Sequence, residues 1–450
     1  MVLDNGNVAK ELDTAAIPAR QAGVCVVIIS EAQQRSDGTK GCFGAELNER
    51  NKGQVSIAKA RTMLQRYLGA LLVTSAEAFG WILDDDMRVD ERADIFLPWL
   101  VEFRKQGIDV LIGAYEGVSP NPPMNGLRVN LLDLHHNLLW LRHQPQSDPL
   151  PDRQAENLAL RKYYPDYYYD LSRKHSANLE LPHWLEPAYA NETVGEAYSR
   201  LLAGAAGILA GQSLTRPLII PPCSDPLISA RDSVNRGGNT FVLNAQSLCQ
   251  TPNTIISIDG KDARRSDMVW AIVTRHYRQM KIKSVAFPVN HVGRSPTAQG
   301  HDFEKLRGEI IGSTLYAAMT EFLNTHTDHR LDFSQQEMEL IGELTDSNLT
   351  KRLQVMKQTC YRISDLRDSL RCTAKSGELE ELFVHLDNWS KPEDMEQMFE
   401  QFGSHNVGEV QRFLASLRPV ADEFAKTSVD IDFIIQQIHG RNGNGKVKQT

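Results

Sequence analysis

The chain has 450 residues, and its 49 Lys and Arg against 57 Asp and Glu give a formal net charge of −8. Hydrophobic residues make up 41 % of the sequence, which is typical of a globular protein and excludes a disordered or collagen-like chain. The length predicts about two or three domains. The mild acidity argues against a nucleic-acid partner, because phosphate recognition needs a basic face.

The signals for a cellular compartment point to the cytoplasm. The six cysteines include no CxxC pair, so we expect free thiols in a reducing environment. The first residues show no basic segment followed by an apolar one, and the run from Leu201 to Gly211 is too short and too rich in Gly and Ala to cross a bilayer. We therefore expect a cytoplasmic protein with no transmembrane segment.

Short apolar runs alternate with amphipathic segments in the first part of the chain. After Gly23 the run VCVVIIS predicts a buried strand, and a polar loop, EAQQRSDGTKG, is expected to follow it. Residues 55–72 predict a helix because their apolar side chains recur every three or four positions, and FGWILDDD predicts a second strand. A helix is then predicted at IFLPWLVEFRKQG and a strand at VLIGAYEG. This order predicts a parallel α/β sheet.

A helical insertion is expected from about residue 131 to residue 217. It carries a cluster of tyrosines, Tyr163, Tyr164 and 167–169, which either pack together or offer a platform for a sugar ring. Strands are predicted again at PLIIPP, GGNTFVLN and KSVAFPV, with a helix at MVWAIVTRHYRQM. The α/β domain is thus predicted to cover residues 23–298, after an N-terminal extension of residues 1–22.

Residues 299–439 predict an all-helical C-terminal region. Apolar residues recur there in steps of three and four, from Leu349 and Leu353 to Leu366 and Leu370. The pattern lasts only about three heptads, which favours an amphipathic helix in a bundle over a dimerising coiled coil. The sequence leaves open whether these helices bind a second copy of the chain or a partner chain. The tail at 440–450 is expected to be disordered.

Asp84, Asp85 and Asp86 give the strongest functional signal. They follow an apolar strand, and ligands of open α/β sheets bind outside the carboxyl ends of strands. Adjacent carboxylates repel one another, and a hard divalent cation with the phosphates of a substrate would offset this repulsion. The alternative is a solvated acidic loop that caps the next helix.

Further motifs surround this acidic run. Upstream lie RSDGT, NKG and the helical ART, and downstream lie RGGNTFVLN, ARRSDMVW and NHVGR. In this order, over residues 24–298, they resemble the motifs of GT-A glycosyltransferases. The resemblance implies a Rossmann-like mixed sheet and the transfer of a sugar from a nucleotide-sugar donor to an acceptor that the sequence does not identify.

The resemblance also implies roles for the matching residues. Asp84 and Asp86 would hold Mn²⁺ or Mg²⁺ with His291 as a further ligand. Asp267 would act as the general base of an inverting enzyme, although retaining members share most of these motifs. The donor would be bound by Asp84, Asp85, Arg61, Ser36 and Asp37. The acceptor side would carry Gly237, Gly238, Asn239, Arg264 and Arg265.

Each of these residues also has another interpretation. Asp267 could cap its helix, and Arg61 could reach the phosphates or be solvated on its helix. His291 could be an ordinary core or surface histidine. Arg264 and Arg265 could instead bind a phosphate or carboxylate on the acceptor, because Arg offers a forked pair of donors.

The resemblance is incomplete at the N-terminus. A GT-A domain opens with a strand, a helix and a second strand before the RSDGT-like turn, whereas here only VCVVIIS and residues 1–22 precede it. The nucleobase pocket must then be completed by another chain, by a longer polypeptide or in another way. Thr62 also replaces a common Asn. Two other functions therefore stay open, a metal-dependent nucleotidyltransferase and a degenerate GT-A scaffold or binding module.

Overall fold

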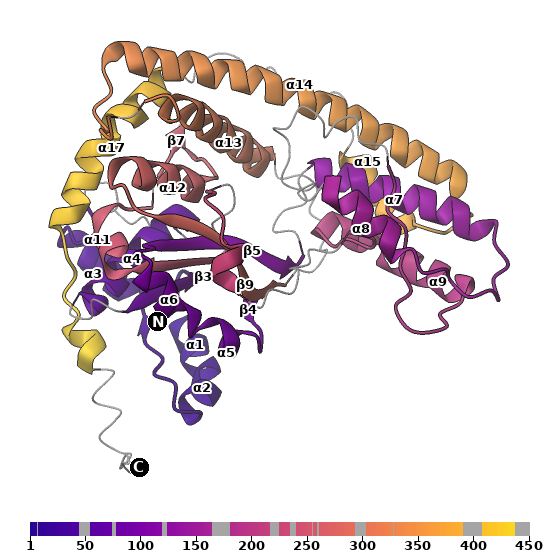
Figure 1. Cartoon of the computed structure of the whole chain (residues 1–450), viewed down its shortest axis with the longest axis horizontal. Coiled ribbons are helices and arrows are strands. Elements are labelled where there is room, and N and C mark those ends of the chain that lie inside the picture. The colour runs from indigo at the N-terminus through magenta and orange to yellow at the C-terminus, as the bar shows by residue number, and fades with distance from the viewer. Residues whose placement is uncertain are drawn as a thin grey trace.

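The computed structural model describes residues 1–6, 8–44, 55–73, 78–118, 124–163, 181–216, 225–234, 240–253, 255–258, 261–292, 303–326, 328–389 and 407–436. The chain is a mixed α/β protein, as predicted. Figure 1 shows a body built around a sheet and a second, helical body beside it, with the long helix α14 (Gln335–Thr373) lying across both. No helix of these described residues is long and apolar enough to cross a membrane.

The main sheet has five strands in the order β3-β6-β5-β9-β4. β5 and β9 pair in parallel, but β6 runs antiparallel to both β3 and β5, and β4 runs antiparallel to β9. The expectation of a parallel sheet is therefore wrong, while the mixed sheet is present. The strands are β3 (Phe79–Leu83), β4 (Met87–Val89), β5 (Val110–Gly117), β6 (Thr240–Asn244) and β9 (Ile282–His291).

Both faces of this sheet are covered. Along β5, Val110 and Ile112 belong to the core under one face and Leu111 to the core under the other, because successive side chains of a strand point to opposite faces. All three are 0 % exposed. Burial on both faces explains why these strands read as continuous apolar runs rather than as alternating patterns.

Two groups of helices provide the cover. One face packs on α4 (Ile57–Leu72), α11 (Ala245–Gln250), α12 (Ser266–Tyr277) and α13 (Phe303–Leu323). The other face packs on α5 (Ala93–Phe96), α6 (Trp99–Lys105) and α10 (Pro226–Ser229). The single helix predicted around residues 95–107 is thus two short ones, and the break falls at Pro98, which has no N–H to donate to a continuous helix.

The first 40 residues contain a separate two-stranded sheet, and their core is shared with α4 and with Val429 and Ile434. β1 (Val2–Leu3) and β2 (Ile28–Ile29) pair in parallel, and α1 (Ala9–Ala15) and α2 (Ile17–Gln21) connect them. The predicted strand VCVVIIS is therefore strand only at Ile28–Ile29. The polar loop expected after it is wrong, because these residues form α3 (Glu31–Thr39), whose start is capped by the Ser30 hydroxyl accepting from the Gln33 N–H at 3.3 Å.

The helical body begins at α7 (Met124–Arg142), somewhat before the predicted start at residue 131. Leu127 and Leu138 of α7 share a core with Leu201 of α9 and Leu370 of α14. The remaining elements of this body are α8 (Gln154–Tyr163), α9 (Val194–Gly204), η3 (Ala205–Ala210) and α15 (Glu380–Trp389). The tyrosines from Tyr164 to Tyr169 and the PLIIPP segment lie outside the described residues.

Helix α14 belongs to two cores at once. Its capping box at Ser334 and Glu337 starts 39 residues of continuous helix. Leu349 and Met356 pack into the core under the main sheet, whereas Ile363 packs into the core of the helical body. The apolar seam predicted from the sequence therefore packs within this chain. α17 (Val407–Lys426) and the short strands β7 (Ser257–Ile258) and β8 (Lys261–Asp262) complete the described elements, and the tail at 440–450 lies outside them.

Candidate active site

The acidic run Asp84–Asp86 forms the turn between β3 and β4. The Met87 N–H donates to the Asp84 carbonyl at 3.2 Å, and the Val292 N–H donates to the Asp86 carbonyl at 2.8 Å. These bonds tie the turn to the end of β9. Asp85 is exposed, whereas Asp84 and Asp86 are half-buried.

Asp84 is paired with Arg61 of α4. The Arg61 Nη2 lies 2.9 and 2.8 Å from the two carboxylate oxygens, and the Arg61 side chain is 7 % exposed. The guanidinium also lies over the ring of Phe241, 5.6 Å from its centroid. Arg61 therefore faces the sheet and its acidic turn rather than solvent.

Three carboxylates meet at this end of β3. Burial raises the pKa of Asp84, Arg61 opposes the shift, and the charges of Asp86 and Asp267 raise the pKa further. Asp267 lies in the first turn of α12 and is 8 % exposed. Asp267, remote from the acidic run in sequence, is thus close enough for its charge to act on Asp84.

His291 faces Asp86 from the last position of β9. Its Nε2 lies 3.2 Å from the Asp86 Oδ2, and its Nδ1 lies 2.7 Å from the Val118 carbonyl oxygen. A carbonyl can only accept, so Nδ1 carries a proton and donates it. In the neutral ring, Nε2 then presents a lone pair to the carboxylate. Among the described residues Nε2 makes no hydrogen bond, although His291 is only 4 % exposed.

Two of the three expected metal ligands face each other, and the third faces Arg61. Asp86 faces His291, and Asp84 faces Arg61. Over the described part of the chain, no three or more His, Cys, Asp or Glu side chains are grouped so that they could hold a metal ion. A cation shared by all three expected ligands would require Asp84 to leave Arg61.

Glu309 of α13 holds the turn that precedes Asp267. It forms an ion pair with Arg265 and lies 3.6 Å from the Nε of Arg264. Burial would raise the pKa of Glu309, but the guanidinium groups of Arg265 and Arg264 lower it overall. The two arginines expected on the acceptor side are therefore engaged with this carboxylate.

The backbone of the same turn is tightly enclosed. Arg265 has a φ of 67°, in the left-handed region, and the Arg264 N–H donates to the Gly308 carbonyl at 3.0 Å. A Cβ atom on Gly312 would lie 1.6 Å from the Arg264 carbonyl oxygen. Sequence reasoning missed Glu309 and its flanking glycines, and the spacing Gly308-x-x-x-Gly312 is the only signal that could have marked a close helix contact.

The other residues expected to bind the nucleotide-sugar donor, Ser36 and Asp37, lie on α3. Asp37 is 1 % exposed on α3, where it accepts from the Tyr67 hydroxyl at 2.7 Å and from the Gln33 amide at 2.9 Å. These bonds make Asp37 a structural acceptor beneath α4. Ser36 is exposed on the same helix rather than in a turn. Gly237, Gly238 and Asn239 lie outside the described residues.

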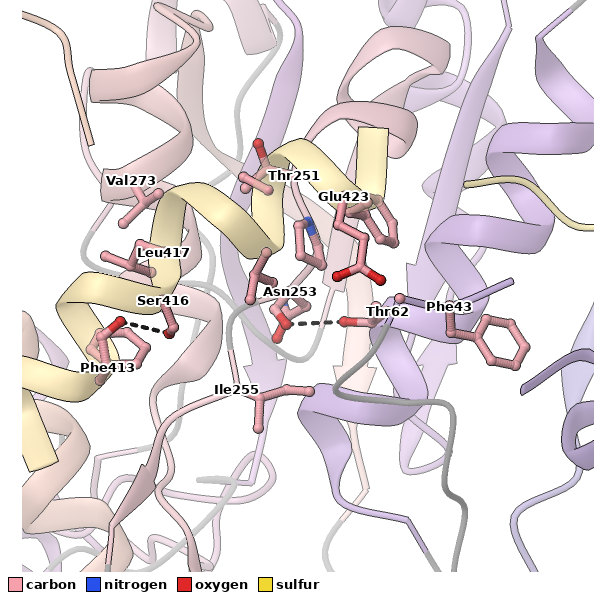
Figure 2. A pocket seen from close by; sticks show the side chains of 15 residues that line it. Phe43, Thr62, Thr251, Asn253, Ile255, Val273, Phe413, Ser416, Leu417 and Glu423 are labelled. Atoms are coloured by element: carbon pink, nitrogen blue, oxygen red, sulfur yellow. Dashed lines mark hydrogen bonds between the residues drawn. The ribbon is translucent and has the colours of Figure 1, made fainter. Parts of the chain in front are cut away.

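A pocket opens between α4, α12 and α17, as Figure 2 shows. About 550 Å³ of empty space lies within it, a figure that includes open solvent at its mouth. Phe413 and Leu417 of α17 give it apolar walls, and Thr62, Asn253 and Glu423 contribute polar groups.

Comparison with protein-family models, curated proteins and solved structures finds no match to this chain. A fold class does not by itself fix an activity. The arrangement of side chains at the end of β3 is therefore the basis for a functional proposal.

Proposed function

We propose that the protein is a metal-dependent glycosyltransferase that moves a sugar from a nucleotide-sugar to an acceptor. The observation that supports this function is the pairing of Asp84 with Arg61 and of Asp86 with His291 at the end of β3, where the charge of Asp267 also acts on Asp84. Asp84 and Asp86 come from the turn after β3, Asp267 comes from α12, and the Arg61 guanidinium lies beside Asp84. This arrangement suits a reaction in which negative charge leaves on one side and a proton is removed on the other.

Glycosyl transfer breaks the bond between the anomeric carbon and an oxygen of the diphosphate. The acceptor hydroxyl forms the new bond, and its proton passes to a carboxylate of the enzyme. Asp267 is the candidate for this base. Arg61, held at 2.8 Å from Asp84, supplies positive charge on the side where the diphosphate departs.

Asp86 and His291 are suited to hold a divalent cation. The His291 Nε2 lies 3.2 Å from a carboxylate oxygen of Asp86, so a cation held here would meet one nitrogen and one oxygen ligand. The Val118 carbonyl fixes the tautomer of the ring, as outer groups do for histidine ligands. Together with substrate phosphates, this pair suits Mn²⁺ or Mg²⁺, and Asp84 would join them only by leaving Arg61. When bound, such a cation would neutralise charge on the departing diphosphate.

The first test is calorimetric titration with UDP, GDP, ADP, CDP and dTDP, each with Mn²⁺ and with EDTA. We expect one nucleotide to bind only with the metal, and Asp86→Asn to abolish this binding. The matched control is Asp94→Asn, which changes an exposed carboxylate on α5 and is expected to bind normally. If no nucleotide binds, or if binding is the same in EDTA, the proposal fails.

A second candidate is the degenerate GT-A scaffold, which the Arg61–Asp84 ion pair favours. A buried arginine satisfies the first carboxylate of the acidic run without any metal. A scaffold would bind a nucleotide-sugar without breaking it, so slow metal-dependent release of the nucleotide distinguishes the two. The nucleotidyltransferase alternative has less support, because helix α3 follows β2 where a Gly-rich phosphate loop would be needed.

A further inference from the structure

The two faces of the main sheet are covered to different depths. Figure 1 shows α12, α13 and α14 stacked above the sheet and α5 and α6 below it. In the described part of the chain, the lower cover consists of α5, α6 and α10, which have four, seven and four residues. This thin cover has an outer side as well as an inner one, and the side chains on its outer side decide what can bind there.

The outer side of this cover carries large apolar side chains. Ile95 of α5 is 71 % exposed, Val101 of α6 is 57 % exposed and Ile228 of α10 is 84 % exposed. Leu97, between α5 and α6, is 44 % exposed. The three helices are neighbours, since α6 packs against both α5 and α10. Single exposed apolar residues are ordinary on a protein surface, but these four on adjoining helices, here called the apolar patch, indicate a binding surface.

Charged residues lie at both ends of the apolar patch. Leu97 and Pro98 keep helical backbone angles, with φ and ψ of −55° and −41° and of −58° and −29°, so α5 and α6 form one kinked helical segment. Residues three or four apart in a helix share a face. Four exposed residues follow one another in such steps along the segment: Asp94, Pro98, Val101 and Lys105. The segment thus has a carboxylate at its start, apolar groups in its middle and an ammonium group at its end.

This order of groups is complementary to itself when it is reversed. Two copies of the segment can lie antiparallel, with a twofold axis between Pro98 and Val101. Asp94 of each copy is then opposite Lys105 of the other, and Pro98 is opposite Val101. A twofold interface brings together the same patch of both copies. We propose that a second copy of this chain covers the apolar patch, and that two ion pairs between Asp94 and Lys105 flank the apolar contact.

The charges within one copy support this arrangement. Among the described residues, no hydrogen-bond or ion-pair partner is found for the Asp94 carboxylate. The Lys105 Nζ lies 2.8 Å from the Glu102 Oε1 of the same copy. A lysine ammonium has three donors, so Lys105 can keep Glu102 and also donate to Asp94 of the second copy. The dimer therefore gives Asp94 a partner without breaking an existing pair.

A lipid surface is the other partner that an apolar patch could suit, and the charges disfavour it. Glu91 and Asp94 are both exposed beside the patch. The anionic leaflet of a membrane attracts Lys and Arg, whereas carboxylates are repelled by it. A second copy instead offers a lysine to each Asp94, which favours the dimer.

The proposal does not depend on the transferase function. Arg61 and Asp267 belong to α4 and α12, which cover the opposite face of the sheet. A dimer formed through α5 and α6 leaves those two helices uncovered. Nucleotide binding should therefore be the same in the dimer and in the monomeric variants described below.

The test is the mass of the full chain in solution, measured by size-exclusion chromatography with light scattering. We expect the wild type at micromolar concentration to show twice the 50.5 kDa of one chain. Val101→Asp puts a carboxylate into the middle of the apolar contact, and this variant should show the mass of one chain.

A reversal of charge tests the ion pairs. Lys105→Glu replaces two attractions with two repulsions, so the dissociation constant of the dimer should rise by at least about tenfold. Combining Asp94→Lys with Lys105→Glu restores both pairs with their signs exchanged, and the dimer should return. A folding defect cannot produce this recovery. The matched control, Lys357→Glu, changes an exposed residue of α14 and should leave the dimer unchanged.

Three results would overturn the inference. The first is a wild-type chain that is monomeric, and the second is a dimer that neither Val101→Asp nor Lys105→Glu weakens. The third comes from flotation with vesicles of phosphatidylserine and phosphatidylcholine, which we expect the chain not to bind. Vesicle binding that Val101→Asp abolishes would assign the apolar patch to a membrane instead.

Discussion

Arg61 lies with its Nη2 atom 2.8 Å from the nearer carboxylate oxygen of Asp84, at the end of β3 where Asp86 and Asp267 also gather. The arginine side chain is 7 % exposed and that of Asp84 is 22 % exposed. A cation buried to this degree sets the charge of the site, and its removal would leave the Asp84 carboxylate without a compensating charge.

Replacing this arginine should destabilise the fold. Arg61→Met keeps most of the side-chain volume but leaves Asp84 without its cation, and we expect a loss of about 3 kcal/mol in the free energy of unfolding at pH 7. The double variant with Asp84→Asn should recover part of this loss. Urea unfolding checks both variants, with the exposed Arg412→Met as the control. Equal stability of Arg61→Met and the wild type would show that the pair contributes nothing.

Glu309 gives a pH dependence with a definite sign. Burial alone would raise its pKa, but Arg265 and Arg264 lower it below the ordinary value of 4.5. Stability from such a group is present above pH 4.5 and is lost as the pH falls through the lowered pKa of the folded state. Glu309→Gln should therefore cost about 2 kcal/mol at pH 7. The difference in the free energy of unfolding between Glu309→Gln and the wild type should disappear in acid. A difference that stays constant with pH would contradict this assignment.

Two glycines one turn apart on α13 should respond differently to alanine. At Gly312 an added Cβ would be 1.6 Å from the Arg264 carbonyl oxygen, whereas at Gly308 its nearest neighbour would be 3.5 Å away. We expect Gly312→Ala to lose about 2 kcal/mol of stability through overpacking. Gly308→Ala should be neutral or slightly stabilising, because alanine favours helices. Thermal unfolding of the pair compares them, and similar melting temperatures would rule out the close contact.

Asp267→Asn tests the proposed general base. If Asp267 takes the acceptor proton, turnover should fall by about 10²- to 10⁴-fold while nucleotide binding is unchanged. Stability should change little, since a carboxylate in the first turn of a helix contributes about 0.3–1 kcal/mol. Steady-state kinetics with the established donor measures this, beside Asp94→Asn as the control. Normal turnover in Asp267→Asn would contradict the role as base; the capping alternative is wrong, because Arg265 is the N-cap of α12 and no side chain caps this helix.

Substitutions in the two parts of helix α14 should disturb different hydrophobic cores. Met356 and Leu370 are both 0 % exposed, but the first packs under the main sheet and the second in the helical body. Truncating either to alanine should cost about 3 kcal/mol. Hydrogen exchange should then quicken around α12 and α13 in Met356→Ala, and around α7 and α9 in Leu370→Ala. Identical exchange patterns in the two variants would contradict the division.

Apolar periodicity predicted several elements close to their observed bounds, among them α4, β3, β5, α12 and β9. Such patterns report which faces are buried but not which strand lies alongside or in which direction, so the antiparallel placement of β6 could not be predicted. The helix at residues 31–39 was missed for another reason. Polar residues and Gly38 suggested a loop, while the cap at Ser30 and the contact of Asp37 with Tyr67 favour a helix there.

At the candidate site, motif order marked Asp84, Asp86, Asp267 and His291, and the structure brings the three aspartates close to one another and His291 against Asp86. The pairing of Arg61 with Asp84 could not be predicted, since an arginine at that helix position fits solvent, phosphate or carboxylate equally well. Glu309 was missed because a single glutamate in an apolar helix carries no local pattern. Its importance arises from two arginines that are remote in sequence.

The pocket walls come from residues as far apart as Phe43 and Phe424. During synthesis, the early walls are made long before α17 leaves the ribosome, so a nascent chain has no closed pocket to fill. A ligand that binds only the completed pocket would stabilise, by mass action, the chains in which α17 has docked. Occupancy of the pocket would thus report that α17 has docked against α4 and α12.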